Sequence, residues 1–172
     1  LRQLVGHGKL EAVIGWAQDF LASEQKLVLF ANHVAVQKAL AAAFPGCATI
    51  AGDQPVEERQ ANVDRFQTDP SCRLIVCSLA AGGIGITLTA ASNVAFIEYT
   101  WTPALMEQAA DRTHRLGQRN AVNVWRFVAE GTIDDYMIDI LEHTAIVVDQ
   151  TTNANERLVD GWFAWLKNKK RV

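Results

Sequence analysis

Five short apolar runs, separated by stretches with a helical period, constrain the fold of this chain more than any other feature. The runs occupy residues 26–31, 48–51, 73–78, 93–98 and 121–128. Short runs that are apolar almost throughout are typical of parallel strands, because both faces of a parallel sheet are buried. Strands joined by helical crossovers predict an α/β fold with a mostly parallel sheet and helices on both faces. Ligands of such folds bind beyond the carboxyl ends of the strands.

The segments between the runs carry apolar residues at helical spacing. Residues 9–21 and 36–44 each predict a helix with one buried face. A third helix, over residues 57–66, has so few apolar positions that a largely exposed face is expected. With 172 residues, of which 49% are hydrophobic and 20% charged, the chain is long enough for one domain with a substantial core.

The C-terminal part of the chain predicts a further helix that packs back on the domain. Thr132 and Asp135 form a capping-box-like start in which aspartate stands in for glutamate. The apolar stripe that follows predicts a brace helix over residues 133–148, and a last amphipathic helix is expected near residues 158–166. We therefore expect a domain with its brace helix over residues 1–150, and a linker with an amphipathic helix over residues 151–172.

Charge and cysteine content exclude several classes of site. The formal net charge of −3 gives no general support for nucleic-acid binding, so any DNA contact must be local. Three cysteines without Cys-x-x-Cys spacing predict free thiols, with neither a disulfide framework nor a metal site. No apolar run approaches the roughly 20 residues of a membrane span, so no membrane partner is expected. Candidates for local basic contacts are Arg112, Arg115, Arg119, Arg126 and the segment 167–171.

Residues 103–116 predict a bounded helix that separates an apolar face from a charged one. Thr102 before Pro103 is typical of a helix start, and Gly117 of a position just past a helix end. A solvated helix face is the simpler interpretation of its arginines when the residues are taken alone. At helical spacing, Gln108, Arg112 and Arg115 share one arc, opposite Met106, Ala109, Ala110, Thr113 and Leu116.

The residue pattern of this segment resembles a known motif. Gln-x-x-x-Arg-x-x-Arg followed by Gly-Gln resembles the last signature motif of superfamily 2 helicases and translocases, and Asp-Arg-x-His-Arg-x-Gly-Gln resembles its Snf2-type branch. In that family the two arginines reach the γ-phosphate of an ATP held by the preceding lobe. The resemblance implies that Arg112 and Arg115 are catalytic arginine fingers and that Gln108 contacts the nucleotide. A planar guanidinium suits this role because it binds phosphate oxygens bidentately and stays charged.

Residues 78–91 leave the third run through three glycines, where missing side chains let a phosphate approach the backbone. A tight strand-to-helix turn explains these glycines equally well. Their position upstream of the arginine segment resembles the fifth motif of the Snf2 family, which touches both the nucleotide and the DNA backbone. The resemblance implies nucleotide contacts at Gly83 and Gly85, and DNA contacts at Ser78, Gly82 and Thr87.

Three further elements resemble parts of the same family. Trp101 belongs to a Trp-x-Pro element whose tryptophan lies against DNA, although an aromatic residue that covers the core is an equal alternative. Asn32 and His33 fit the motif that follows the first strand, and Gly52 and Arg59 fit a glycine followed by a helix that bears an arginine. The resemblance therefore implies DNA contacts at all five residues. Residues 129–136 look like the annealing-helicase branch in particular.

Together these elements span residues 9–148 and resemble the second RecA-like lobe, a three-layer domain, of a Snf2-type translocase on double-stranded DNA. The implied cofactor is ATP with Mg²⁺. No Gly-Lys-Ser/Thr phosphate loop and no Asp-Glu box occurs in the sequence, so ATP is expected to be held mainly by a first lobe, N-terminal to Leu1 on the same polypeptide. The full-length protein is then expected to be a DNA-dependent ATPase, and this chain alone to be inactive.

The resemblance also implies partners and leaves two alternatives. Expected partners are the first lobe and double-stranded or branched DNA, in repair or remodelling. The location is expected to be cytoplasmic and nucleoid-associated in a bacterium, or nuclear in a eukaryote. An RNA or DNA helicase lobe of another superfamily 2 branch is one alternative, against which Gln118 and Trp101 argue. A non-catalytic RecA-like adaptor domain is the other, against which the arginine segment and the glycines argue.

Overall fold

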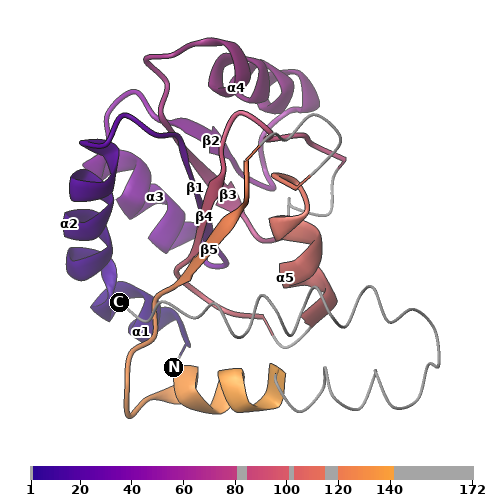
Figure 1. The fold of residues 1–172 in the computed structure, drawn as a ribbon. Coiled ribbons are helices and arrows are strands. Elements are labelled where there is room, and N and C mark those ends of the chain that lie inside the picture. Colours follow the sequence, from indigo (N-terminus) through magenta and orange to yellow (C-terminus); the bar gives the residue numbers. More distant parts are fainter. Residues whose placement is uncertain (1, 81–84, 101–102, 115–119, 142–172) are drawn as a thin grey trace.

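A parallel sheet forms the centre of the molecule (Figure 1). The structure is a computed structural model that describes residues 2–80, 85–100, 103–114 and 120–141. Within them, five parallel strands follow the order β2-β3-β1-β4-β5, which confirms the predicted α/β fold. The strands are β1 (Leu27–Ala31), β2 (Ala48–Ile50), β3 (Leu74–Ser78), β4 (Asn93–Phe96) and β5 (Asn123–Arg126).

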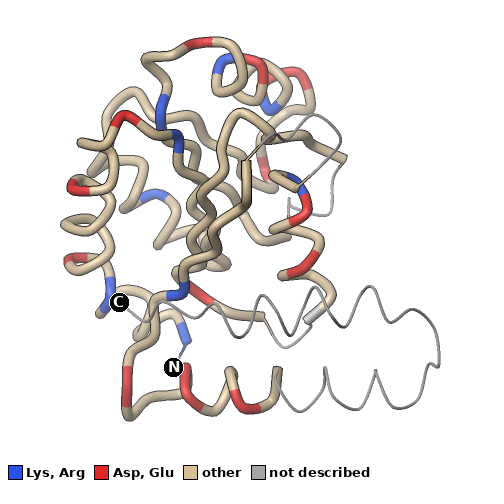
Figure 2. Tube along the Cα trace, viewed as in Figure 1, with Lys and Arg blue, Asp and Glu red and all other residues tan. Residues whose placement is uncertain are grey.

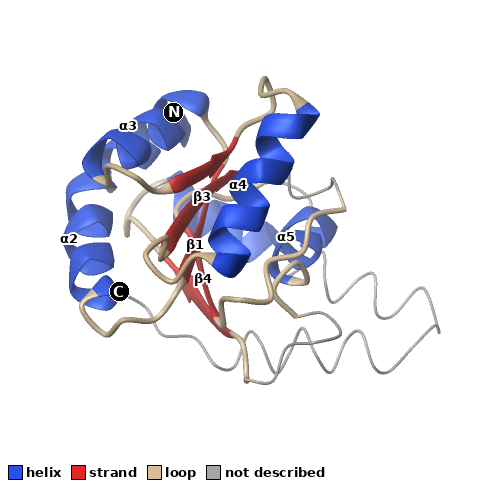
Figure 3. Ribbon diagram, turned by 90° about the horizontal axis from the view of Figure 1, so that it is seen from above, coloured by secondary structure: helices blue, strands red, loops and turns tan. Residues whose placement is uncertain are grey.

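Helices cover both faces of the sheet, which makes three layers (Figure 3). One face carries α2 (Leu10–Leu21) and α3 (Val34–Ala43), and the other carries α4 (Val56–Thr68) and α5 (Pro103–Ala110). A short helix, α1 (Arg2–Gly8), precedes α2 and was not predicted from the sequence.

The strands divide their side chains between two apolar clusters, because successive residues of a strand point to opposite faces. Val28 and Phe30 of β1 belong to the cluster under α4 and α5, whereas Leu27 and Leu29 belong to the cluster under α2 and α3. Phe30 stacks on Phe96 of the neighbouring strand, with 5.3 Å between ring centroids. Burial on both faces explains why these strands are visible in the sequence as continuous apolar runs.

The helix at residues 133–141 packs against the α4 and α5 face, below the sheet in Figure 1. Its start is capped as expected: the Thr132 hydroxyl accepts a hydrogen bond from the Asp134 amide at 3.2 Å. Asp135 reaches back to the Gly131 amide at 2.6 Å, one residue earlier than in a capping box. Met137, Ile138 and Leu141 are buried, so the predicted brace is confirmed up to residue 141. The rest of the brace and residues 151–172 lie outside the described residues.

A helix was predicted over residues 103–116, but α5 already ends at Ala110. Beyond it the chain tightens into a turn in which the Arg112 amide donates to the Ala109 carbonyl at 3.3 Å. Both the amide and the hydroxyl of Thr113 donate to the Ala110 carbonyl, which competes with helical bonding. The Leu88 amide donates to the Arg112 carbonyl at 2.7 Å, so a loop from elsewhere in the chain takes an acceptor that a longer helix would use.

Three further observations bear on the sequence predictions for membrane helices, cysteines and the fifth strand. None of the described helices is long and apolar enough to cross a membrane. Cys47, Cys72 and Cys77 are free thiols, and burial raises the pKa of Cys77 far above the usual range of a thiol. Within the described residues the fifth strand covers 123–126, which is shorter than the predicted run of 121–128, and it lies at an edge of the sheet next to β4.

Candidate functional site

Helix α5 presents the arginine segment by burying its opposite face. Met106 and Ala109 are fully buried in the apolar cluster on the face of the sheet that carries α4 and α5, as the apolar spacing predicted. Gln108 is exposed on the last turn, and Arg112 follows in the turn beyond the helix. Arg112 is only 9% exposed, so the interpretation of a solvated arginine face is wrong for this residue.

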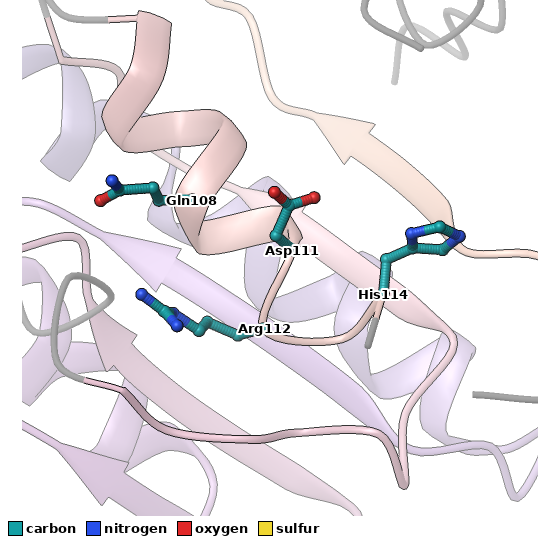
Figure 4. A pocket seen from close by; sticks show the side chains of 4 residues that line it. All are labelled: Gln108, Asp111, Arg112 and His114. Atoms are coloured by element: carbon teal, nitrogen blue, oxygen red, sulfur yellow. The ribbon is translucent and has the colours of Figure 1, made fainter. Parts of the chain in front are cut away.

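A pocket of about 390 Å³ lies at this end of α5 and is lined by Gln108, Asp111, Arg112 and His114. Figure 4 shows that the Gln108 and Arg112 side chains extend in the same direction, one above the other. His114 extends the opposite way, and Asp111 points away from the Arg112 side chain. The structure therefore brings together two of the residues predicted to contact the nucleotide, Gln108 and Arg112.

Arg112 and Gln108 bring hydrogen-bond donors to this pocket, and the charged form of the neighbouring Glu107 is disfavoured. A guanidinium offers N–H donors in a fixed fork, and the Gln108 amide can add a further donor. Partial burial raises the pKa of Glu107, and the nearby Asp111 carboxylate raises it further. Donors of this kind bind the oxygens of phosphate groups in proteins. The Asp111 carboxylate would repel such a group, but its side chain is directed elsewhere.

The loop that precedes β4 lies against the turn that carries Arg112. The Leu88 amide donates to the Arg112 carbonyl, and the Gln67 side chain of α4 holds the loop by bonds to Thr89 and to the Ala90 amide. Leu88, the residue after Thr87, is therefore in contact with the arginine turn. Gly85 is exposed, and a Cβ atom there would meet nothing within 4 Å, so the described chain has room around it.

The described DNA-contact candidates other than Thr87 lie at or next to the carboxyl edge of the sheet. Asn32 and His33 follow β1, Ser78 ends β3, and Gly52 follows β2. Because β3 lies between β1 and β2, and Ser78 pairs with Ala31, the ends of these strands are neighbours. Arg59 lies in the first turn of α4, and its buried Nε atom has no hydrogen-bond partner among the described residues.

Glu98 is a buried residue at this edge that the sequence analysis missed. It is 4% exposed, and its Oε2 accepts hydrogen bonds from the Asn32 and His33 amides, both at 2.8 Å. Its Oε1 lies 2.5 Å from Nδ1 of the His33 ring. The available signal was an acidic residue at the end of a buried apolar run, where a charge needs a partner.

Lys9 is a second buried polar residue that the sequence analysis missed. Its Nζ donates to Asp134 at 2.6 Å, to the Phe127 carbonyl at 3.0 Å and to the Ile97 carbonyl. Desolvation lowers the pKa of Lys9, and the Asp134 and Glu98 carboxylates oppose that shift. This contact joins the start of α2 to the ends of β4 and β5 and to the helix at 133–141.

Several predicted residues are not among those that the structure describes. Gly82, Gly83, Trp101, Arg115 and Arg119 and the segment 167–171 lie outside the described residues. Arg126 is described and is buried on β5, and its part in a local basic contact stays a prediction. Figure 2 shows the described Lys and Arg positions scattered along the chain rather than gathered in one segment.

Comparison with known proteins identifies the family. Residues 9–117 match the model of the helicase conserved C-terminal domain. The chain belongs to this family. It is 38% identical over 135 residues to the mouse DNA annealing helicase and endonuclease ZRANB3, covering 76% of this chain and 13% of that protein. A Caenorhabditis elegans relative, a homolog of the SWI/SNF-related matrix-associated actin-dependent regulator of chromatin subfamily A-like protein 1, is 37% identical over 139 residues (78% and 20%).

Solved structures of Snf2-type ATPases share the fold of this helicase lobe. The C-terminal part of the Fun30 ATPase domain aligns with a TM-score of 0.72 and 27% identity, over 78% of this chain and 45% of that one. The Sulfolobus solfataricus SWI2/SNF2 ATPase C-terminal domain aligns with a TM-score of 0.62 over 80% and 56%, and at 24% identity it shows the fold alone. The predicted Snf2-type, RecA-like lobe is confirmed. The chain spans a fifth or less of the two curated relatives named above.

Proposed function

We propose that this helicase lobe is the second motor lobe of an ATP-dependent translocase on double-stranded DNA, and that it supplies arginine fingers for ATP hydrolysis. The observation that carries the proposal is the buried Arg112, whose side chain extends beside Gln108 in a pocket at the end of α5. Burial reduces solvent screening of its charge, and the turn fixes its position before any ligand arrives. Both properties suit a donor that stabilises charge developing on a phosphate.

The nucleotide would meet residues of both lobes. ATP with Mg²⁺, bound mainly by a first lobe, supplies the phosphoryl group that is transferred to water. Arg112 would donate to the terminal phosphate through its guanidinium, and Gln108 would add an amide contact from the last turn of α5. The Leu88 amide holds the Arg112 carbonyl, which would keep the turn in place while the lobes close.

The carboxyl edge of the sheet would contact the DNA backbone. Asn32, His33, Gly52 and Ser78 lie at neighbouring strand ends, and Arg59 lies in the adjacent first turn of α4. Amides, hydroxyls and a few cationic groups position a protein on phosphates without reading sequence. A formal net charge of −3 supports few, local contacts of this kind. The mouse relative ZRANB3 is a DNA annealing helicase, which supports DNA as the partner of this chain.

The test is DNA-stimulated ATP hydrolysis by the full-length protein and its Arg112→Ala variant. We expect turnover to fall on the order of 10³-fold, as loss of an arginine finger does, while ATP binding remains. Arg112→Lys should recover little, since an ammonium cannot replace a planar fork. Arg65→Ala removes an exposed arginine of α4 and serves as the matched control. Turnover near the wild-type value in Arg112→Ala would contradict the proposed role.

Substrate class is tested with the same protein. Duplex and branched DNA should stimulate turnover, and triplex displacement should occur without separation of duplex strands. Stimulation by RNA alone, or robust unwinding of a blunt duplex, would favour a helicase lobe of another superfamily 2 branch. Absence of ATP turnover in the wild-type protein would favour the adaptor alternative.

A further inference from the structure

Glu98 binds the backbone at the start of a helix that is far from it in sequence. The N-cap residue of α3 is His33, and its own side chain makes no capping hydrogen bond. Instead, Glu98 Oε2 accepts the backbone N–H groups of Asn32 and His33. A carboxylate at this end of a helix is stabilised both by these donors and by the helix dipole. The course of the backbone after β1 therefore depends on a side chain that follows β4.

The same carboxylate sets the orientation of the His33 ring. Glu98 Oε1 lies 2.5 Å from Nδ1, and because a carboxylate can only accept, Nδ1 carries the proton of this bond. Nε2 is then the ring atom left for another ligand, and it has no hydrogen-bond partner in the described part of the chain. The His33 side chain is 26% exposed and that of Glu98 4%, so the ring is accessible while its support is not.

Residues of α1 and α3 surround Glu98 and the Asn32–His33 segment. A Cβ atom built on Gly6 of α1 would come within 2.6 Å of Glu98 Oε1, which shows how closely α1 covers the carboxylate. From α3, the Gln37 amide donates to the Ala31 carbonyl at 3.1 Å and to the Asn32 carbonyl at 3.4 Å. The segment is thus held on both of its sides, which is the condition for a preorganised contact.

We propose that Glu98 is a positioning residue for DNA binding: its carboxylate accepts from Nδ1–H of a doubly protonated His33 ring and holds the Asn32–His33 segment, so that the Nε2–H group of His33 donates to a phosphate oxygen of the DNA backbone. The inference rests on the proposed function, in which this edge of the sheet faces DNA, and adds the residue that orients the contact. The ligand class is the phosphate of the DNA backbone, so the contact should be independent of base sequence.

The test compares four variants of the full-length protein in DNA affinity and in the DNA dependence of ATP turnover. Glu98→Gln keeps the size of the side chain but has one carbonyl oxygen, which cannot accept from both the backbone amides and the ring. Gly6→Ala displaces the carboxylate without changing its charge. His33→Ala removes the ring, and the double variant Glu98→Gln with His33→Ala tests whether the two residues act together. Asp139→Asn, an exposed carboxylate on the helix at 133–141, is the control.

We expect Glu98→Gln, Gly6→Ala and His33→Ala each to raise the Kd for a duplex oligonucleotide on the order of tenfold, the size expected for one hydrogen bond to a charged group. The DNA concentration for half-maximal turnover should rise in parallel, whereas maximal turnover should fall far less. The double variant should bind DNA about as weakly as either single variant, since both remove the same contact. Asp139→Asn should match the wild type.

Three outcomes would overturn the inference and leave the proposed function standing. If His33→Ala weakens DNA binding but Glu98→Gln does not, His33 binds without positioning by Glu98. If the two effects multiply in the double variant, Glu98 acts elsewhere. If neither variant changes DNA affinity while DNA still stimulates ATP turnover, the positioning role is wrong and the proposed function stands. A wild-type protein whose turnover does not respond to DNA would remove the proposed function, and the inference with it.

Discussion

Replacing Lys9 by methionine should destabilise the protein strongly, because this substitution leaves a buried carboxylate without its cation. The Lys9 and Asp134 side chains are 8% and 7% exposed, and their closest atoms lie 2.6 Å apart. After the substitution, Asp134 Oδ2 would keep the Ala129 amide, at 3.1 Å, as its partner within the described part of the chain. The carbonyls of Ile97 and Phe127 would lose the ammonium as well.

The expected magnitude follows from this geometry. Removing one partner of a buried ion pair costs about 3–5 kcal/mol, since the other charge stays desolvated. Asp134→Asn should cost a comparable amount, because it leaves the Lys9 ammonium buried while the amide oxygen can still accept from Ala129. Desolvation is the largest influence on Lys9 and lowers its pKa, so the attraction to Asp134 offsets only part of the free-energy cost of burying the ammonium. The double variant Lys9→Met with Asp134→Asn should therefore cost much less than the sum of the two single changes.

Denaturant unfolding of the wild type, both single variants and the double variant measures the coupling directly, provided that the m values agree. We expect a coupling of at least about 2 kcal/mol, which is within the range for residues in direct contact or in one ion-pair network. A Lys9→Met variant within about 1 kcal/mol of the wild type would refute the burial of the pair. Single changes that simply add would refute the contact between the two side chains.

Two further predictions concern the packing of the last described helix and the charge of α5. Leu141→Ala should lower the free energy of unfolding by about 2–5 kcal/mol, because the Leu141 side chain is only 2% exposed. As a control, Asp139→Ala changes an exposed residue of the same helix and should alter the free energy of unfolding by less than about 0.5 kcal/mol. Equal losses for the two variants in chemical denaturation would contradict the packing of this helix on the domain. The raised pKa of Glu107 means that its charged form is disfavoured in the folded state, so Glu107→Gln should raise the Tm at pH 7. This gain should disappear as the pH falls below the ordinary value of 4.5, where the carboxyl is protonated in both states, and a gain that is constant from about pH 3 to about pH 8 would contradict the cause.

The sequence by itself determined the strands, the class of fold and the family. A strand buried on both faces must be apolar at nearly every position, so β1, β3 and β4 were found within about two residues of their bounds. Helical crossovers implied parallel pairing, which the structure confirms. The segment that contains Arg112 carried the family resemblance, because its residue types and their spacing match a motif of that family.

Only the tertiary structure decided which residues meet at the site. The strand order β2-β3-β1-β4-β5 brings the strand ends at Asn32, Ser78 and Gly52 together, and no local pattern specifies that order. Helix α5 ends at Ala110 because Leu88, from another part of the chain, takes the Arg112 carbonyl.

Burial of Lys9 and Glu98 was also decided by tertiary contacts alone. Asp134 lies 125 residues from Lys9, and Asn32 lies 66 residues from Glu98. A charged residue in a sequence is expected to be exposed, because leaving water costs free energy unless a partner compensates it. Whether such a partner exists depends on contacts between distant segments, which form only when the sheet brings the ends of β1, β4 and β5 to one edge.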